Sequence, residues 1–438
     1  MNFMKKLVIC FLGLMLALGG ISGLVEAQTK DFGGETITFG GNVEPREEWE
    51  GSDKAHLERV EEDFNVNIEF DRRLHDDFTE SLRNSVIAGD PFADIIVEAG
   101  HIMETMAVEG FVEPLDDYLD EEYYNSLPDM HQDAEKYTAI GETTYGFSVN
   151  HDMTTSSTVI IWNKEMFERE GLESLYELQN SGDWTWDKML EIAQKLTKDT
   201  DGDGETDQWG FQGVWPPNWV VVSGTFLSNN AAPVLEEDGK MVYGLDNVEA
   251  IETLEFWQDL IDNGVTNPEQ EGQELFLKGQ LGMLYANAHV VDDISDEMEE
   301  DYGMVFFPKG PHGDEYVGHA EPYYLGFLPI GTENPEELIE LANALYEVTD
   351  EYADVDEYED EIMEDWGEVA RDRETLANFE KLMTQWEPIR YIIGQGNLGE
   401  SVVGGPINEV INGEQSATEA MEAAEPEAQT WIDEFFGQ

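Results

Sequence analysis

Hydrophobic and polar positions follow two different periods along the N-terminal part of the chain. Residues 36–39, 66–70 and 93–98 are apolar at alternate positions or throughout, as the strands of a buried sheet are. Residues 56–64 and 78–88 carry apolar side chains every three to four positions, as amphipathic helices do. Because strands and helices alternate in this order, the pattern predicts an α/β fold with a mainly parallel sheet flanked by helices.

The clearest helix pattern begins at Thr185. Its hydroxyl is suited to an N-cap, and Asp187 places a carboxylate in the first turn, where the helix dipole favours an anion. Apolar residues then recur at positions i, i+3, i+4 and i+7, so one face is expected to pack in a core: Met189, Ile192, Ala193 and Leu196.

An acidic loop follows this helix and has the spacing of part of a calcium-binding loop. Compared with the twelve-residue EF-hand, Gly204 occupies position six, but position twelve is Gly210 instead of the bidentate glutamate. A complete EF-hand is therefore excluded. Two alternatives remain, a truncated loop that holds a structural Ca²⁺ and an acidic turn without a cation; no other cofactor is expected. The candidate ligands are Asp199, Asp201, Asp203, Glu205 through its carbonyl, and Asp207.

Length and charge narrow the class of protein. A chain of 438 residues is too long for one ordinary core, so two domains are expected, and 41% hydrophobic residues argue against global disorder. The net charge of −75 argues against nucleic acid and anionic membranes as partners, because phosphate contacts need clustered Lys and Arg. So much like charge predicts a protein that works in high salt, where the Debye length falls to about 3 Å. The alternative is an acidic protein that binds many divalent cations.

Residues 1–27 have the pattern of a secretory signal peptide. Two lysines precede a short apolar run at residues 7–18, and Val25 and Ala27 stand at the −3 and −1 positions of a cleavage site. The run is too short to span a membrane. Cys10 lies inside the apolar run, so no lipid-anchor cysteine is evident, and the mature chain has no thiol. The sequence predicts export to the periplasm or the extracellular space.

Polar residues follow two of the predicted strands. In open α/β sheets, ligands bind at the carboxyl ends of the strands. Asn42 and Glu44 come after the strand at 36–39, and Glu98 and His101 come at the end of the strand at 93–98. These four residues are therefore candidate ligand-binding residues.

Motifs along nearly the whole mature chain resemble one known family. In order, the chain shows YGFS, IIWNKEMF, a Trp-Asp helix with an Asp/Gly loop, a helix before Gly-Val, FLKGQLGM, a Tyr-Gly-Met segment ending in Pro-Lys-Gly, and a last helix after Ile-Asn-Gly. Each motif is weak alone, but seven in one order resemble the extracellular solute-binding proteins of ABC importers, in the maltose and multiple-sugar branch. The segments are 145–148, 160–167, 186–211, 250–264, 276–283, 302–310 and 411–421.

This resemblance implies a two-lobe, periplasmic-binding-protein-like fold with the ligand in a cleft between the lobes. The N-terminal lobe would hold residues 33–144 and 303–350, and the C-terminal lobe 145–302 and 351–438. Hinge closure would capture a carbohydrate, such as an oligosaccharide, and the permease subunits of an ABC importer would receive it. The protein would act as a monomer and would not be an enzyme. We expect the acidic segment 350–365 to be a solvated helix or loop.

The resemblance also suggests residues that line the cleft. Trp215 and Trp219 flank a Pro-Pro turn and could stack on sugar rings, although tryptophans are more often core residues, as we expect for Trp184, Trp186 and Trp209. The family's usual stacking tryptophan falls on His289, so Tyr285 or Trp219 would have to replace it. Further candidates are Asn287, Glu321 and Tyr323. Adjacent strand residues point to opposite faces, so at most one of Tyr323 and Tyr324 faces the ligand, and Tyr323 is favoured.

Two other functions remain open. A secreted polysaccharide-active enzyme would need two carboxylates with separated pKa values in the cleft, and the sequence contains no His-Glu-x-x-His or comparable metal motif. A binding protein for a cationic or peptide solute is encouraged by Glu44, Glu98 and Glu321. Turnover of glycans, or stabilisation by amino compounds alone, would distinguish these alternatives.

Overall fold

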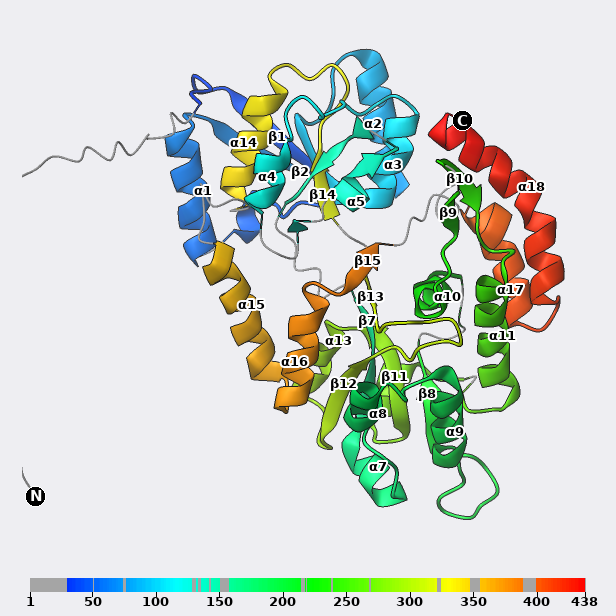
Figure 1. Cartoon of the computed structure of the whole chain (residues 1–438). Helices are drawn as coiled ribbons and strands as arrows, with labels where there is room; N and C mark the ends of the chain where they lie inside the picture. Colours follow the sequence, from blue (N-terminus) through cyan, green and yellow to red (C-terminus); the bar gives the residue numbers. More distant parts are fainter. Residues whose placement is uncertain are drawn as a thin grey trace, which may run out of the picture.

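The computed structural model consists of two α/β lobes joined by several chain segments (Figure 1). It describes residues 30–49, 51–73, 76–127, 131–132, 135–141, 143–149, 157–213, 217, 219–237, 239–267, 269–320, 324–346, 355–388 and 399–437. The expected signal peptide lies outside these residues. Within them, no helix has the length and apolar character needed to cross a bilayer.

The first lobe is built on a five-stranded sheet in the order β2-β1-β3-β14-β6. Strand β1 pairs in parallel with β2 and β3, whereas β14 runs antiparallel to β3 and β6. The sheet is therefore mixed. The strands are β1 (Thr36–Gly41), β2 (Asn67–Arg72), β3 (Ile95–Ala99), β6 (Gly146–Phe147) and β14 (Tyr324–Phe327).

Alternate residues of β3 face two different cores. Ile95 and Val97 pack in a cluster with α1 (Gly51–Asp63) and α14 (Pro335–Leu345), whereas Ile96 packs in a cluster with α2 (Asp76–Ala88) and α3 (Gly100–Val108). A strand buried on both faces explains the continuous apolar run in the sequence. Smaller elements complete this lobe: η1 (Arg46–Glu48), α4 (Glu121–Asn125), α5 (Glu135–Thr138), β4 (Ala139–Ile140) and β5 (Thr143–Thr144).

The second lobe is built on a four-stranded sheet in the order β12-β7-β11-β8. Strand β7 is antiparallel to both of its neighbours, and only β11 and β8 pair in parallel. The prediction of a mainly parallel sheet is therefore wrong for this lobe, since local apolar periodicity does not specify strand direction. The strands are β7 (Thr158–Asn163), β8 (Trp209–Gln212), β11 (Leu281–Asn287) and β12 (Tyr302–Phe306).

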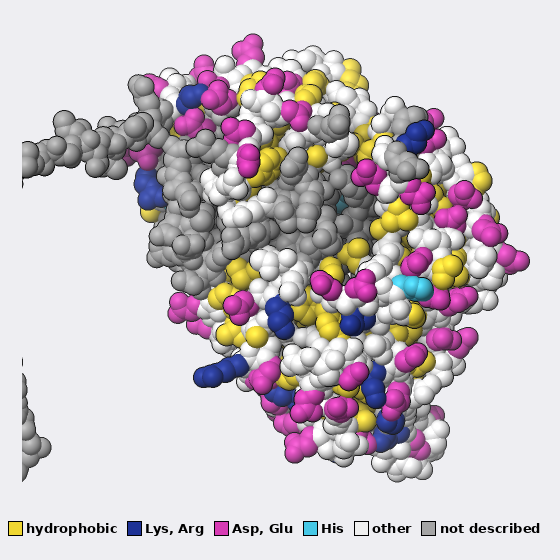
Figure 2. Space-filling view, in the orientation of Figure 1, with side chains coloured by type: hydrophobic (Ala, Val, Ile, Leu, Met, Phe, Trp, Pro, Cys, Tyr) yellow, Lys and Arg dark blue, Asp and Glu magenta, His cyan; other side chains and the backbone are white. Residues whose placement is uncertain are grey.

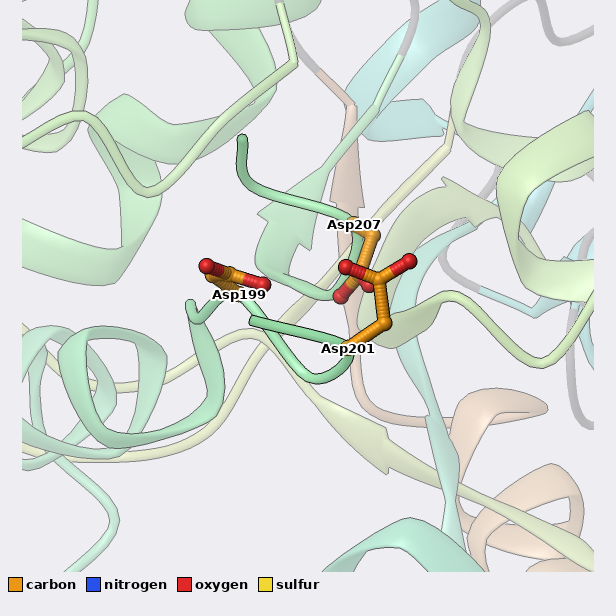
Figure 3. A group of neighbouring side chains, drawn as sticks. All are labelled: Asp199, Asp201 and Asp207. Atoms are coloured by element: carbon orange, nitrogen blue, oxygen red, sulfur yellow. The ribbon is translucent and has the colours of Figure 1, made fainter. Parts of the chain in front are cut away.

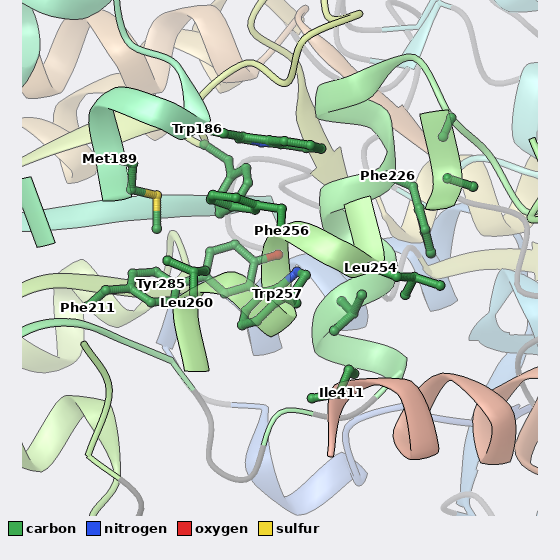
Figure 4. Close-up of a cluster of buried hydrophobic side chains, with 14 of the residues drawn as sticks. Trp186, Met189, Phe211, Phe226, Leu254, Phe256, Trp257, Leu260, Tyr285 and Ile411 are labelled. Carbon is green, nitrogen blue, oxygen red and sulfur yellow. The ribbon is translucent and has the colours of Figure 1, made fainter. Parts of the chain in front are cut away.

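Helix α9 (Trp186–Leu196) confirms the sequence analysis of its cap and of its buried face. The Thr185 hydroxyl accepts the backbone N–H of Lys188, and all four predicted stripe residues are buried. The core beside α9 is strongly aromatic: the rings of Trp186 and Phe256 stack at 4.6 Å with an interplanar angle of 7° (Figure 4). Trp184 is fully buried as well, so both tryptophans are core residues as expected.

The remaining elements also surround the second sheet. They are α7 (Lys164–Glu170), α8 (Leu175–Ser181), α10 (Trp219–Phe226), η3 (Leu227–Asn229), β9 (Val234–Glu237), β10 (Lys240–Tyr243), α11 (Val248–Asp262), α12 (Gly272–Leu277), α13 (Val290–Ser295), α15 (Val355–Val369), α16 (Arg373–Leu382), η5 (Gly399–Gly404), α17 (Gly405–Ile411) and α18 (Ala417–Phe436).

The chain returns to the first lobe later than the sequence analysis expected. Strand β12 pairs with β7 in the second sheet, although residues from 303 onward were placed in the first lobe. The first strand of the return that joins the first sheet is β14, and β13 (Gly318–Ala320) pairs with β15 (Trp386–Pro388) between the lobes (Figure 1). Likewise, β6 still belongs to the first sheet, so the outward crossing follows residue 147.

The acidic segment that was expected to be solvated contributes to a core. Helix α15 begins at residue 355, and its Ile362 and Trp366 are buried in a cluster with β12 and α13. The ring of Trp366 stacks on Phe379 of α16 with the centroids 4.0 Å apart. Glu364, Asp365 and Glu368 are exposed, so the described part of this helix is amphipathic.

Candidate functional site

Strand directions bring the ends of both sheets to the boundary between the lobes. In the first sheet, the last residue of β3, Ala99, pairs with Tyr324, the first residue of β14, and β1 ends opposite Val97 of β3. In the second sheet, Thr158 at the start of β7 lies opposite Asn287 at the end of β11. Only residues 148–157 separate β6 from β7, and three residues separate β13 from β14, so short connections join the first-lobe edge to the second lobe. The candidate site lies at these edges.

The end of β1 requires a glycine, and this glycine positions Asn42. Gly41 has φ +104°, and a Cβ at that position would lie 2.4 Å from the carbonyl oxygen of Val97. A side chain would therefore be strained and would clash with backbone. The close approach lets the N–H of Asn42 donate to the same carbonyl at 2.8 Å, which directs Asn42 past the sheet edge.

Asn42, Glu98 and Tyr324 form a polar group at the first-lobe edge. The side chain of Asn42 lies within hydrogen-bonding reach of the hydroxyl of Tyr324, and Glu98 lies close enough to act on that hydroxyl by its charge. Burial, followed by the negative charge of Glu98, raises the pKa of Tyr324, and the hydrogen bond with Asn42 partly opposes this shift. Tyr324 therefore stays protonated and can donate a hydrogen bond.

Glu98 is fully buried, and one of its carboxylate oxygens accepts the N–H of Ala99 at 3.0 Å. The predicted residues Asn42 and Glu98 are thus brought together by the fold. Tyr324 was missed, because the sequence analysis favoured its neighbour Tyr323. What places Tyr324 in this group is the pairing of two distant strands, because Tyr324 of β14 pairs with Ala99 of β3.

The two other first-lobe candidates lie near this group but not within it. Glu44 is exposed, and its charge adds to burial in raising the pKa of Tyr346, the residue that follows α14. His101 is half-buried in the first turn of α3, where its carbonyl accepts the hydroxyl of Thr105 at 2.9 Å. Their role in ligand binding stays a prediction.

Tyr285 is a core residue and not a stacking platform. Its ring is 4% exposed and packs edge-on against Trp257 and Phe307, with centroids 6.0 Å and 5.2 Å away (Figure 4). Its hydroxyl donates to the carbonyl of Val221 at 3.3 Å. Neither face of the ring is available to a sugar, so the structure contradicts this candidate; an apolar strand pattern cannot distinguish a core ring from a cleft ring.

The other second-lobe candidates lie at or beyond the sheet edge. Asn287 is half-buried at the end of β11, and His289 is exposed immediately before α13. Trp219 begins α10, which follows the end of β8, but its side chain is not among the described ones. The candidates Trp215, Glu321 and Tyr323 lie outside the described residues.

The acidic loop after α9 lies at the far end of the second lobe. Asp199, Asp201 and Asp207 each bring one carboxylate oxygen within 4.8 Å of the others (Figure 3). This spacing suits a single Ca²⁺, whose oxygen ligands lie at about 2.3–2.6 Å from the ion. Asp203 lies outside this group, and its carboxylate accepts the N–H of Glu205 at 2.8 Å. The fold thus gathers three of the four predicted carboxylates.

Asp199 also organises the loop backbone. Its carboxylate accepts the N–H groups of Gly204 at 2.8 Å and Gly202 at 2.6 Å, which hold the pKa of Asp199 below its ordinary value. Both glycines have positive φ, which permits the tight turn. The carboxylate therefore remains ionised at neutral pH and is available to a cation.

The sheet edges and the lobe arrangement define a two-lobe binding protein, and comparisons with known proteins agree. Residues 49–349 match the family described as bacterial extracellular solute-binding protein, and the chain belongs to this family. Among curated relatives, binding proteins of Brucella abortus and Brucella suis are 23% identical over 308 residues, which are 68% of this chain and 68% of each relative.

Solved structures share the fold over most of the chain. An ABC substrate-binding protein of Listeria monocytogenes, solved with cycloalternan, covers 92% of this chain and 99% of its own, with a TM-score of 0.61 and 16% identity. A cyclic α-maltosyl-1,6-maltose binding protein of Arthrobacter globiformis covers 91% and 98%, with a TM-score of 0.63 and 17% identity. A cyclo/maltodextrin-binding protein with maltotetraose covers 90% and 96%, with a TM-score of 0.64 and 16% identity.

Proposed function

We propose that this protein captures a carbohydrate, preferably an oligosaccharide of the maltodextrin type, outside the cytoplasm and delivers it to the permease of an ABC importer. The polar group of Asn42, Glu98 and Tyr324 at the lobe boundary carries the proposal. Its half-buried amide and phenol can accept from and donate to neighbouring sugar hydroxyls, beside the fully buried carboxylate of Glu98. The fold shared with oligosaccharide-binding proteins supports the same ligand class.

Delivery to a permease requires that the protein releases the sugar chemically unaltered. Closure of the lobes would stabilise the bound form through contacts on both sides, and opening would free an unaltered sugar. The family consists of solute-binding proteins, which favours binding over catalysis. Incubation with maltotetraose followed by chromatography should return the sugar intact, and shortened products would instead favour the enzyme alternative.

Maltotetraose is expected to raise the melting temperature of the protein in molar NaCl, and Asn42→Ala should weaken its binding. Losing the Asn42 side chain removes one ligand partner and the amide next to the Tyr324 hydroxyl, so we expect about a tenfold increase in Kd. Isothermal titration calorimetry measures this change. Asn263→Ala, on an exposed turn after α11, is the matched control and should bind like the parent.

A ligand panel distinguishes the solute classes. Stabilisation by amino compounds or basic peptides, with no effect of any saccharide, would contradict the carbohydrate proposal and favour a cationic solute. The buried carboxylate of Glu98 alone does not decide this question, because carboxylates also bind sugar hydroxyls in pairs.

We further propose that the acidic loop holds a structural Ca²⁺ through Asp199, Asp201 and Asp207. In molar NaCl, Ca²⁺ at a hundredfold excess over its Kd should stabilise the protein by about 2.7 kcal/mol, and EDTA should reverse this. Asp201→Asn removes one charged ligand and should abolish the shift. Asp203→Asn makes the same charge change outside the group and should keep it. Equal responses of parent and Asp201→Asn would contradict the site.

We also propose that the protein works in high salt. Acidic side chains are spread over both lobes of the visible face instead of gathering in one patch (Figure 2). With 97 acidic and 22 basic residues, long-range repulsion opposes the compact state unless salt screens it.

A further inference from the structure

Most of helix α18 packs against the second lobe. Ala428 and Ile432 are fully buried in the second-lobe core. The side chain of Gln429 also pairs with the backbone of β10: the N–H of Tyr243 donates to its oxygen at 2.8 Å, and its amide donates to the carbonyl of Met241 at 3.3 Å. These contacts hold the helix in place up to its last turn.

The last turn of α18 packs against the first lobe. Phe435 is 6% exposed and belongs to the first-lobe cluster formed by α2, α3, β3 and β14. Trp431 stacks on Phe435 with centroids 5.3 Å apart, and Phe436 packs edge-on at 5.0 Å. Trp431 and Phe436 pack against both the first-lobe and the second-lobe clusters. Figure 1 shows the C-terminal end of α18 reaching up beside α3.

The spacing along the helix makes this contact continuous with the second-lobe core. Residues 428, 432 and 435 stand at i, i+4 and i+7, so they form one apolar stripe on one face of the helix. The stripe begins in one lobe and ends in the other. The two lobes are therefore linked by a packed aromatic group in addition to the chain crossings.

We propose that Trp431, Phe435 and Phe436 form an interlobe anchor that limits how far the lobes move apart or rotate in the solute-free protein. Any arrangement that separates the anchor from the first lobe exposes aromatic surface to water and is disfavoured. The anchor thereby sets how often the solute-free protein adopts each arrangement of the lobes, and a solute binds preferentially to one of these arrangements. Its consequence for solute capture rests on the proposed function, but the anchor itself does not.

The test measures the distance between the lobes. Glu62→Cys on α1 and Glu168→Cys on α7 provide exposed labelling sites on the two lobes, and Cys10, in the expected signal peptide, is the chain's one native cysteine. Electron spin resonance distances from spin labels are recorded for the parent, Phe435→Ala and Ile432→Ala, without solute and in molar NaCl. Ile432→Ala is the matched control, because this residue is buried only in the second-lobe core.

We expect Phe435→Ala to broaden the distance distribution at least about twofold and Ile432→Ala to leave it unchanged while lowering the melting temperature. Phe435→Leu, which keeps an apolar side chain, should broaden the distance distribution less than Phe435→Ala does. It replaces the alanine variant in the test if that variant does not fold. An unchanged distribution in Phe435→Leu or Phe435→Ala would overturn the anchor. Maltotetraose is then added to the labelled parent: no change in distance would argue against the proposed function and leave the solute-free result standing.

Discussion

The melting temperature of the protein is expected to rise by about 10 °C between 0.05 M and 3 M NaCl. The physical reason is screening: the Debye length falls from over 10 Å to about 3 Å or less, so repulsion among acidic side chains is confined to nearest neighbours. The net charge of −75 makes this repulsion, and therefore the effect of screening it, unusually large. Thermal unfolding followed by circular dichroism measures the change.

Two controls separate screening from other effects of salt. Sucrose at equal osmolality strengthens burial without screening charge, so it should reproduce only a small part of the rise. Millimolar Ca²⁺ at low NaCl tests the alternative that the protein requires many divalent cations. A melting temperature that stays flat or falls with NaCl would remove the high-salt proposal.

Asp372→Ala is expected to lower the free energy of unfolding by about 2–4 kcal/mol. Its carboxylate caps α16 by accepting the N–H of Thr375 at 2.7 Å, and it pairs with Lys164 at 2.7 Å. It also accepts the hydroxyl of Tyr176 at 2.9 Å. Removing it leaves Lys164, whose side chain is 22% exposed, with Asp301 as its remaining carboxylate partner. Urea unfolding in molar NaCl measures the loss.

Two substitutions make this result specific. Asp372→Asn keeps an N-cap acceptor but loses the charge, so it should lower the free energy of unfolding by about half as much as Asp372→Ala. Glu191→Ala removes a carboxylate that pairs with Lys188 and Lys195 on the exposed face of α9 and should produce no measurable change. A loss for Asp372→Ala no larger than that of Glu191→Ala would contradict the network.

The same network predicts a pH dependence. Burial by itself would raise the pKa of Asp372, but hydrogen bonds from Lys164, Thr375 and Tyr176 together hold this pKa below its ordinary value. A depressed folded-state pKa contributes stability above the unfolded value of about 3.9, and this contribution is lost as the pH falls through the folded value. The stability difference between the parent and Asp372→Asn should therefore be full above about pH 5 and shrink in acid.

Features that depend on residues close together in the sequence were predicted correctly. The N-cap of α9 and its apolar stripe depend on contacts within a few residues and with one core, and the glycine at position 210 explains why an EF-hand is incomplete. The boundary at residue 303 was wrong for the opposite reason. Which sheet β12 joins is decided by its register with β7, and the apolar pattern of β12 suits either sheet.

The site shows the same division between local and distant information. Asn42 and Glu98 could be nominated because polar residues after strands lie at a common edge. Tyr324 could not be chosen over Tyr323, since its place beside Asn42 results from the pairing of β14 with β3. Tyr285 was assigned to the cleft, although Trp257 and Phe307 enclose its ring in the core.

By itself, the sequence determined the class of fold, the family, the acidic character, the first helices and strands and helix α9, because periodicity, capping and ordered motifs are properties of neighbouring residues. Only the tertiary structure decided which sheet each returning strand joins, which aromatic rings are buried, which carboxylates of the acidic loop converge and how α18 bridges the lobes. These outcomes depend on contacts between residues far apart in the chain, where burial and strand register select one arrangement among several that the local pattern permits.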